Sequence, residues 1–391
     1  MNPDNKIDIP ASLENGNAGT DLLATYWPSI IVIGIAILLV ALWIWRARRD
    51  PDHASRRVRR GFLWWVPTGI ALFVAVALGV NTWVGYLPSV SAVERWLSDT
   101  PPNPEVISNK KPVEGTGSTV LPSSERRVTT ASSGYSFLAT IPSTATDVPN
   151  SGAWVYLPPD YDKPGNTKRY PVIYALHGSP GSAADWFAGG RIDVTLEELI
   201  KSGQFPKAIV VAPDLNAGPA RRSTEPLNFP GGPQIEDYMV KDVVGWADKT
   251  LRTEPEASKR IVAGMSSGGF ASLIYSLRYP EEFGSAISLL PYGKPYSKGI
   301  VGNAEAMRDN TPLHLIRELP RGTKQTFFIG QDDGESLRAA ELINEDLRTR
   351  GDISTMRSYP GLQHNWTAAR TMMPYGLVWT AQQLGWDEKT S

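Results

Sequence analysis

Residues 260–280 read RIVAGMSSGGFASLIYSLRYP, and this stretch decides the fold. Its first half has the apolar residues of a β-strand, and its second half has those of a helix that stops at Pro280. Between the two, residues 264–268 match the pattern G-x-S-x-G, in which a serine occupies a sharp turn from strand to helix. A plain glycine-rich turn is the alternative interpretation. The flanking strand and helix favour the serine turn, so we predict that Ser266 is a nucleophile whose hydroxyl projects over the edge of a sheet.

Short apolar runs alternate with amphipathic helical stretches on both sides of this motif, which is typical of an α/β domain with a largely parallel sheet. Each predicted strand is followed by a stretch that can form a right-handed crossover. The predicted strands are residues 154–157, 172–176, 208–212, 261–264, 286–290, 326–329 and a last one in 354–361. The predicted helices are residues 192–202, 235–251, 267–279, 336–350 and 375–385.

A serine hydroxyl is a poor nucleophile unless a base accepts its proton, and neutral imidazole is the usual base. His177 precedes Ser266 in the chain, and His314 has the setting of a residue on an ordinary helix. His53 lies in an arginine-rich segment between two long apolar stretches. The fourth and last histidine, His364, follows the last predicted strand, which suits the chain order serine, acid, histidine. We predict that His364 is the base, with a structural histidine as the alternative.

The third member of such a triad is a carboxylate that orients the imidazole. The segment TFFIGQDDGES delivers Asp332 and Asp333 directly after a predicted strand. We favour Asp333 over Asp332, and we rank Glu335 behind both. Acids in a turn can also be solvated residues without a catalytic role, so the acid is the weakest of the three predictions.

Negative charge on the tetrahedral intermediate requires backbone N–H donors. The residue after the nucleophile, Ser267, is the expected first donor. The segment VIYALHGSPGS ends a predicted strand and places Ser179 where the second donor is expected. His177 then has the position of a structural support for that turn.

These motifs together resemble the esterase family that includes esterase D, feruloyl esterases, enterochelin esterase and the antigen 85 mycolyltransferases. The resemblance extends over nearly all of residues 125–391 and rests on VYLPPDYDKPG, RYPVIYALHGSPGSAADW, IVAGMSSGGFASLIYSLRYPEEFGSAIS, FFIGQDD and GLQHNW. It implies an α/β-hydrolase fold with a mostly parallel central sheet, no metal and no organic cofactor. It also implies the catalytic residues Ser266, His364 and Asp333 and the oxyanion donors Ser267 and Ser179. Members of the family commonly have methionine at the position of Ser267, a change that leaves the backbone role intact.

Two uncharged apolar stretches, residues 26–45 and 62–86, are each long enough to cross a bilayer. The segment between them carries seven arginines, and the segment before them is slightly acidic, which predicts a cytoplasmic loop with both termini outside. A cleavable signal peptide or a buried helix pair are the alternatives. The predicted organisation is a membrane anchor over residues 1–96, a flexible linker over 97–124 and an esterase domain over 125–391.

Composition narrows the function further. The formal net charge of −1 argues against nucleic acid as a partner, and the absence of cysteine excludes thiol nucleophiles and disulfides. We expect an extracytoplasmic serine esterase of the plasma membrane that acts on an envelope lipid, glycolipid or acylated glycan. The anchor is similar to that of membrane-bound esterases of actinobacterial envelopes. A mycolyltransferase-like acyltransferase, a peptidase and a non-catalytic binding protein are the alternatives.

Aromatic residues next to the predicted active-site loops are candidates for an apolar acyl pocket. They are Trp186, Phe187 and Trp366. Each can equally be a core residue. We expect residues 291–321 to form part of the substrate rim.

Overall fold

The computed structural model describes residues 7–14, 22–49, 57–90, 93, 129–218, 224–320 and 325–386. The predicted linker, His53 and the middle of the segment between the two apolar stretches, residues 50–56, lie outside the described residues. The division of the chain into three parts therefore stays a prediction.

The domain that follows the apolar stretches is built on one eight-stranded sheet with the order β1-β2-β4-β3-β5-β6-β7-β8. The strands are β1 Tyr135–Ile141, β2 Ser151–Leu157, β3 Val172–Leu176, β4 Ile209–Pro213, β5 Arg260–Met265, β6 Ser285–Leu289, β7 Thr326–Gln331 and β8 Ile353–Ser358. Strands β3 to β8 pair in parallel, while β1 pairs antiparallel with β2 and β2 antiparallel with β4. The predicted fold class is confirmed.

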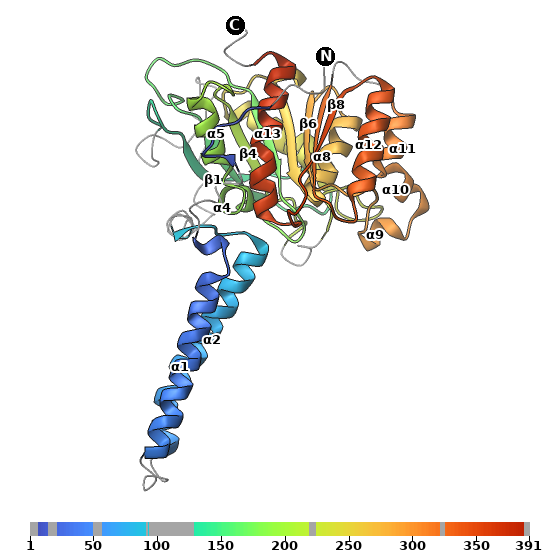
Figure 1. The fold of residues 1–391 in the computed structure, drawn as a ribbon. Helices are drawn as coiled ribbons and strands as arrows, with labels where there is room; N and C mark the ends of the chain where they lie inside the picture. The colour runs from blue at the N-terminus through green and yellow to red at the C-terminus, as the bar shows by residue number, and fades with distance from the viewer. Residues whose placement is uncertain are drawn as a thin grey trace.

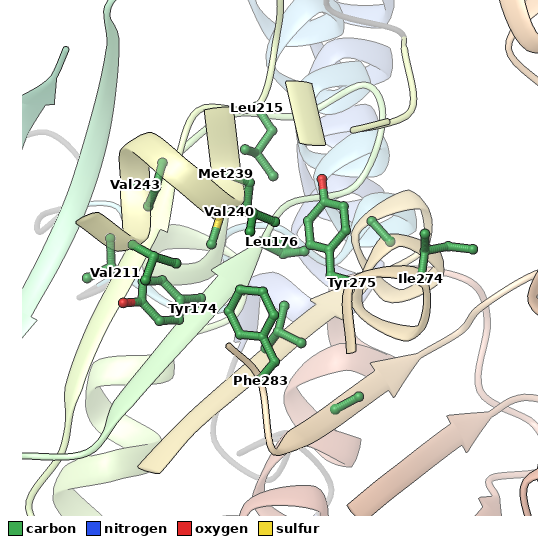
Figure 2. Close-up of a cluster of buried hydrophobic side chains, with 14 of the residues drawn as sticks. Tyr174, Leu176, Val211, Leu215, Met239, Val240, Val243, Ile274, Tyr275 and Phe283 are labelled. Atoms are coloured by element: carbon green, nitrogen blue, oxygen red, sulfur yellow. The ribbon is translucent and has the colours of Figure 1, made fainter. Parts of the chain in front are cut away.

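Helices cover both faces of the sheet (Figure 1). The longer ones are α5 Ile192–Lys201, α8 Ser267–Arg278, α12 Leu337–Arg350 and α13 Trp366–Leu384. Shorter ones are α4 Asp185–Ala188, α6 Ile235–Asp237, α7 Val244–Thr250, α9 Lys298–Val301, α10 Ala304–Asp309 and α11 Pro312–Glu318, and a π-helical segment, Tyr238–Val243, joins α6 to α7. Figure 2 shows part of the core beneath α8, where Leu176 of β3 lies beside Tyr275 and Tyr174 of the same strand packs against Phe283. Ile173 and Ala175, the alternating residues of β3, point into the second core under α5 and α13.

The first strand and the last helix differ from the sequence prediction. Strand β1 was not predicted, because its residues alternate between buried and half-buried positions and include polar side chains. Helix α13 begins at Trp366, nine residues before the predicted start. The helix contains Pro374, although proline removes a helical hydrogen bond. The Asn365 side chain caps its first turn by accepting from the Ala368 N–H.

The two apolar stretches form the helices α1 Trp27–Arg49 and α2 Arg57–Val84, which pack side by side and project from the domain as a hairpin (Figure 1). Their most apolar windows, Trp27–Arg46 and Trp64–Val84, are each only 11% buried within the protein. Large apolar side chains such as Ile37 and Phe73 are exposed, at 63% and 75% of their surface. The hairpin is therefore not a core element of the domain.

Residues ahead of the hairpin contact the domain directly. Ile9 and Leu13 are buried in the core that α5 covers. The Ser12 hydroxyl donates to the Glu198 carboxylate at 3.1 Å, and the Gln204 amide donates to the Asp8 carbonyl at 2.7 Å. The segment before the hairpin therefore packs against the same domain that follows it.

Candidate active site

Ser266 occupies the turn between β5 and α8, where the sequence places it. Its backbone has φ 57° and ψ −119°, a conformation that is strained for any residue other than glycine. Two hydrogen bonds hold the turn: the Ser266 N–H donates to the Leu289 carbonyl at 2.9 Å, and the Phe270 N–H donates to the Ser266 carbonyl at 2.8 Å. This strand–turn–helix geometry is that of a nucleophile elbow, which exposes the serine hydroxyl above the sheet.

Two glycines allow the elbow to close. A Cβ on Gly264 would lie 2.2 Å from the Gly268 carbonyl oxygen, and a Cβ on Gly268 would lie 2.3 Å from the Leu176 carbonyl oxygen. Any side chain at either position would push β3, β5 and α8 apart. The two glycines of G-x-S-x-G are thus required for the backbones to approach this closely.

The loop after β3 lies beside the nucleophile. A Cβ built on Gly178 would lie 3.5 Å from the Ser266 Cβ, so the Gly178–Ser179 backbone borders the Ser266 side chain. Ser267 is the first residue of α8, where backbone N–H groups have no acceptor within the helix. Both predicted oxyanion donors therefore flank Ser266, and the positive end of the α8 dipole adds to their effect.

His177 supports this loop from beneath. It is 5% exposed, and its Nε2 accepts from the Leu215 N–H at 3.0 Å. Because Nε2 is an acceptor, the ring proton is on Nδ1, which donates to the Gly178 carbonyl at 2.7 Å. Both ring nitrogens are thus engaged with the backbone. The prediction that His177 is a structural support is confirmed.

Ser266 and His364 line the same cavity of about 410 Å³. Its other lining residues are 83–84 at the end of α2, 178–180 after β3, Met265, and Gln363, Asn365 and Trp366 around the start of α13. The imidazole is exposed at the mouth of the cavity. Even so, the surrounding protein removes enough water to lower the pKa of His364 below its ordinary value. The ring is therefore kept in the neutral form that a base requires.

The two candidate acids have different surroundings, although they are adjacent in the chain. Asp332 is 6% exposed, its Oδ1 accepts from the Gly334 N–H at 3.1 Å, and its charge raises the pKa of His364 against the effect of burial. Asp333 is exposed, and its Oδ2 accepts from the Gly361 N–H at 3.4 Å. The structure thus favours Asp332 and not Asp333, because the chain turns after β7 so that the first carboxylate points inward.

The three predicted pocket aromatics separate into two groups. Trp366 lines the cavity and packs edge-on against Trp186 at 5.2 Å between ring centroids. Trp186 is fully buried and its indole N–H donates to the Leu176 carbonyl at 2.7 Å. Phe187 is 8% exposed and packs against Trp154. Trp186 and Phe187 are therefore core residues, because α4 turns them away from the cavity.

Sequence reasoning missed the buried Glu225, which holds the loop that follows β6. The Glu225 carboxylate is fully buried and accepts from the Tyr292 hydroxyl at 2.7 Å, the Ser297 N–H at 2.8 Å and the Tyr296 N–H at 3.1 Å. These hydrogen bonds hold Tyr296 beside the loop that contains Ser179. Burial raises the pKa of the Tyr296 hydroxyl, and the hydroxyl groups of Ser179 and Ser267 act in the opposite direction and lower it. The expected rim segment, 291–321, thus contributes Tyr296 beside Ser179 and Ser267.

Within the described parts of the chain, no group of three or more histidine, aspartate and glutamate side chains is positioned to hold a metal ion. The groups at the cavity are instead a hydroxyl, an imidazole and backbone N–H groups, and the buried Asp332 carboxylate acts on the imidazole. This set fits acyl transfer through a serine.

Comparison with known sequences places this site in context. A family described as "Putative esterase" matches residues 149–374. An esterase of Mycobacterium tuberculosis is 36% identical over 144 residues, which are 36% of this chain and 28% of that protein. An endo-1,4-beta-xylanase/feruloyl esterase of Xylanibacter ruminicola is 30% identical over 137 residues, which are 33% of this chain and 18% of that protein. The chain thus spans less than a third of the length of these curated relatives.

Solved structures share the fold of the catalytic domain. A ferulic acid esterase superposes with a TM-score of 0.57 at 20% identity, covering 64% of this chain and 99% of its own. An S-formylglutathione hydrolase from Agrobacterium tumefaciens gives a TM-score of 0.56 at 20% identity, covering 66% of this chain and 98% of its own. At this level of identity the likeness establishes the fold alone.

Proposed function

The chain belongs to the esterase family, and from this premise we propose that it is a serine hydrolase of carboxylic esters with Ser266 as nucleophile, His364 as base and Asp332 as orienting acid. The observation that carries the proposal is the cavity that Ser266 and His364 share, with the Ser179 loop and the α8 N-terminus at its wall. The charge of Asp332, which raises the pKa of His364 against the effect of burial, supports its assignment as the orienting acid.

Acylation uses these groups in one order. The Ser266 Oγ attacks the ester carbonyl carbon, and its proton passes to His364. The carbonyl oxygen becomes an oxyanion that accepts hydrogen bonds from the N–H groups of Ser179 and Ser267. When the intermediate collapses, the ester C–O bond breaks and His364 returns the proton to the departing alcohol. The acyl group is then bound to Ser266.

Deacylation repeats the sequence with water. His364 removes a proton from the water molecule, the hydroxide attacks the acyl carbon, and the bond to Ser266 Oγ breaks as the serine recovers a proton from His364. An acceptor alcohol in place of water would turn the same cycle into acyl transfer. The His364 side chain is exposed at the cavity mouth, which gives water direct access and favours hydrolysis.

We further propose that α1 and α2 cross a bilayer and that the catalytic domain is extracytoplasmic. The exposed apolar surface of the hairpin and the seven arginines between the two spans in the sequence support this. The contact of Asp8 and Ser12 with the domain supports it independently, because two spans return the chain to the side on which it started. This argument also disfavours a cleaved signal peptide, since cleavage would remove a packed segment.

The proposal is tested with the full-length chain in phospholipid vesicles. We expect a fluorophosphonate probe to label Ser266, and we expect hydrolysis of p-nitrophenyl acetate at a rate far above that of the matching p-nitroanilide. Mass spectrometry of the labelled peptide identifies the serine. Label on another residue, or faster cleavage of the anilide, would overturn the assignment as an esterase.

The dependence of activity on pH distinguishes the two acids. A base must be neutral, and the pKa of His364 is lowered from 6.5, so we expect kcat/KM for p-nitrophenyl acetate to fall to half its maximum below pH 6.5. Because the Asp332 carboxylate raises that pKa, Asp332→Asn should move this midpoint to still lower pH and reduce the maximal kcat/KM by about 10²- to 10⁴-fold.

Asp333→Asn is the matched control for this measurement. It removes the same charge one residue away, from an exposed side chain that bonds to the Gly361 N–H. We expect its midpoint and its maximal rate to stay within about twofold of the native enzyme, as for surface substitutions in general. The reverse pattern, with the large effects in Asp333→Asn, would return the role to Asp333.

A further inference from the structure

The end of α2 is built into the catalytic site. The Asn365 side-chain amide, next to His364 in the chain, donates to the Trp83 carbonyl at 3.1 Å. Arg370 is 3% exposed and donates to the Gly85 carbonyl at 2.5 Å. Gly85 has φ 68°, and a Cβ there would lie 2.5 Å from the Thr367 hydroxyl oxygen, so the helix ends against the first turns of α13.

Residues on either side of Gly85 continue this contact. The Tyr86 hydroxyl donates to the Asp185 carboxylate at 2.9 Å, and its ring packs edge-on against Trp366 at 6.5 Å. Burial and the Asp185 charge raise the pKa of Tyr86, so its hydroxyl stays protonated as a donor. Val84 packs against the core that contains Trp366. The hairpin is thus fixed to the domain next to the active site.

The same helix end forms a wall of the catalytic cavity. Trp83 and Val84 line the cavity together with Ser266 and His364. Trp83 is nevertheless 64% exposed, so this residue borders the cavity and also faces the surroundings of the hairpin. Because the Trp83 backbone is bonded to Asn365, this wall keeps its position relative to the imidazole.

An apolar strip runs from this wall down α2. Phe73, Val76, Val80 and Trp83, which we call the α2 strip, follow one another at intervals of three, four and three residues and therefore share one helix face. They are 75%, 65%, 53% and 64% exposed. At 1.5 Å per residue, the strip is about 15 Å long, half the thickness of the hydrocarbon core.

We propose that the substrate is a long-chain lipid ester that remains in the outer leaflet, with its acyl chain along the α2 strip and its ester bond at Ser266. A strip that no protein covers lies against lipid chains in a bilayer. Its upper end is the wall of the catalytic cavity, so a chain lying on the strip reaches the nucleophile without leaving the apolar phase. Trp83, at the end of the span, sits at the depth where tryptophan is enriched, which is also the depth of lipid ester bonds.

This inference rests on the proposed function and narrows its substrate. An acylated glycan or another soluble ester would approach from water and would gain nothing from the strip. A lipid ester gains apolar contact over the length of the strip, and extraction of its chain into water is avoided. The two substrate classes therefore respond differently to changes in α2.

The test compares two esters of one fluorogenic alcohol with the full-length chain in phosphatidylcholine vesicles. 4-Methylumbelliferyl palmitate is dissolved in the bilayer, and 4-methylumbelliferyl acetate is added to the aqueous phase. Rates are divided by the amount of enzyme that a fluorophosphonate probe labels, so that misfolded protein is not counted. We expect Trp83→Ala to lower the ratio of the palmitate rate to the acetate rate by about tenfold or more.

Trp27→Ala is the matched control. Trp27 is 65% exposed and begins α1 at the same end of the hairpin, yet it is not among the residues that line the cavity. We expect its ratio to stay within about twofold of the native value. A second variant, Val80→Ala, leaves the Trp83 contacts in place and should lower the ratio by about threefold, because it removes two methyl groups from the strip.

Equal ratios in Trp83→Ala and Trp27→Ala would overturn the inference, as would a native enzyme that cleaves the palmitate ester only after detergent has removed it from the vesicles. Either result leaves the proposed function standing as long as the acetate ester is cleaved. Absence of both acetate cleavage and probe labelling would instead remove the proposed function itself. The two failures are therefore distinguishable.

Discussion

Ser266→Ala is expected to reduce hydrolysis of p-nitrophenyl acetate by the full-length chain by at least about 10⁴-fold, to the level that binding and the oxyanion donors supply without a nucleophile. The reason is that no acyl-enzyme forms when the Oγ is absent. The substitution removes one oxygen and leaves the Ser266 backbone, its bond to Leu289 and the start of α8 unchanged. The melting temperature and the circular dichroism spectrum should therefore match those of the native protein.

Ser267→Ala controls for this experiment. Ser267 is also a serine of the elbow, but its proposed role belongs to its backbone N–H, which alanine retains. We expect kcat/KM to stay within about tenfold of the native value, because only a buried hydroxyl is removed. Residual activity of Ser266→Ala near the native level would refute the nucleophile, whatever the control shows.

The elbow and the base were predictable because their signals are local. A strand, a G-x-S-x-G turn and a helix lie within residues 260–280, and glycine at 264 and 268 has a steric reason that the structure bears out. The base followed from elimination among four histidines. The bonds of His177 to Leu215 and Gly178 show why that elimination was sound, since both of its ring nitrogens are occupied.

The acid was not predictable from the same kind of pattern. Asp332 and Asp333 follow one strand directly, and beyond a strand end the alternation of side chains no longer says which one points inward. The difference arises from the Gly334 N–H that turns Asp332 into the interior and from the Gly361 N–H that holds Asp333 at the surface. Both depend on the path of the loop.

The contribution of α2 to the cavity lay beyond sequence reasoning for a different reason. An uncharged run ending in Trp83 has the composition of a membrane span, and composition carries no information about what the end of the span touches. The bonds of Asn365 and Arg370 to its last carbonyls join residues more than 280 positions apart. Glu225 and Tyr292 are a similar case, since a buried glutamate has no signature in a polar loop.

His364→Ala is expected to reduce kcat for p-nitrophenyl acetate by at least about 10³-fold, because the Ser266 hydroxyl then has no acceptor for its proton. KM should change little, since the imidazole contributes to the transition state and not to ground-state binding. The imidazole is exposed at the cavity mouth, so added imidazole can enter the space that alanine leaves. We therefore expect imidazole in the assay to restore part of the lost rate, which a purely structural histidine would not allow.

Two other histidines give this prediction its contrast. His314→Ala, on α11, should keep kcat within about twofold, because that residue lies outside the cavity. His177→Ala should lower the melting temperature, because the Leu215 N–H and the Gly178 carbonyl lose buried partners. Imidazole is not expected to rescue it, since the site is closed to solvent. If imidazole rescued His177→Ala but not His364→Ala, the roles of the two histidines would be reversed. His177 would then be the base that activates Ser266.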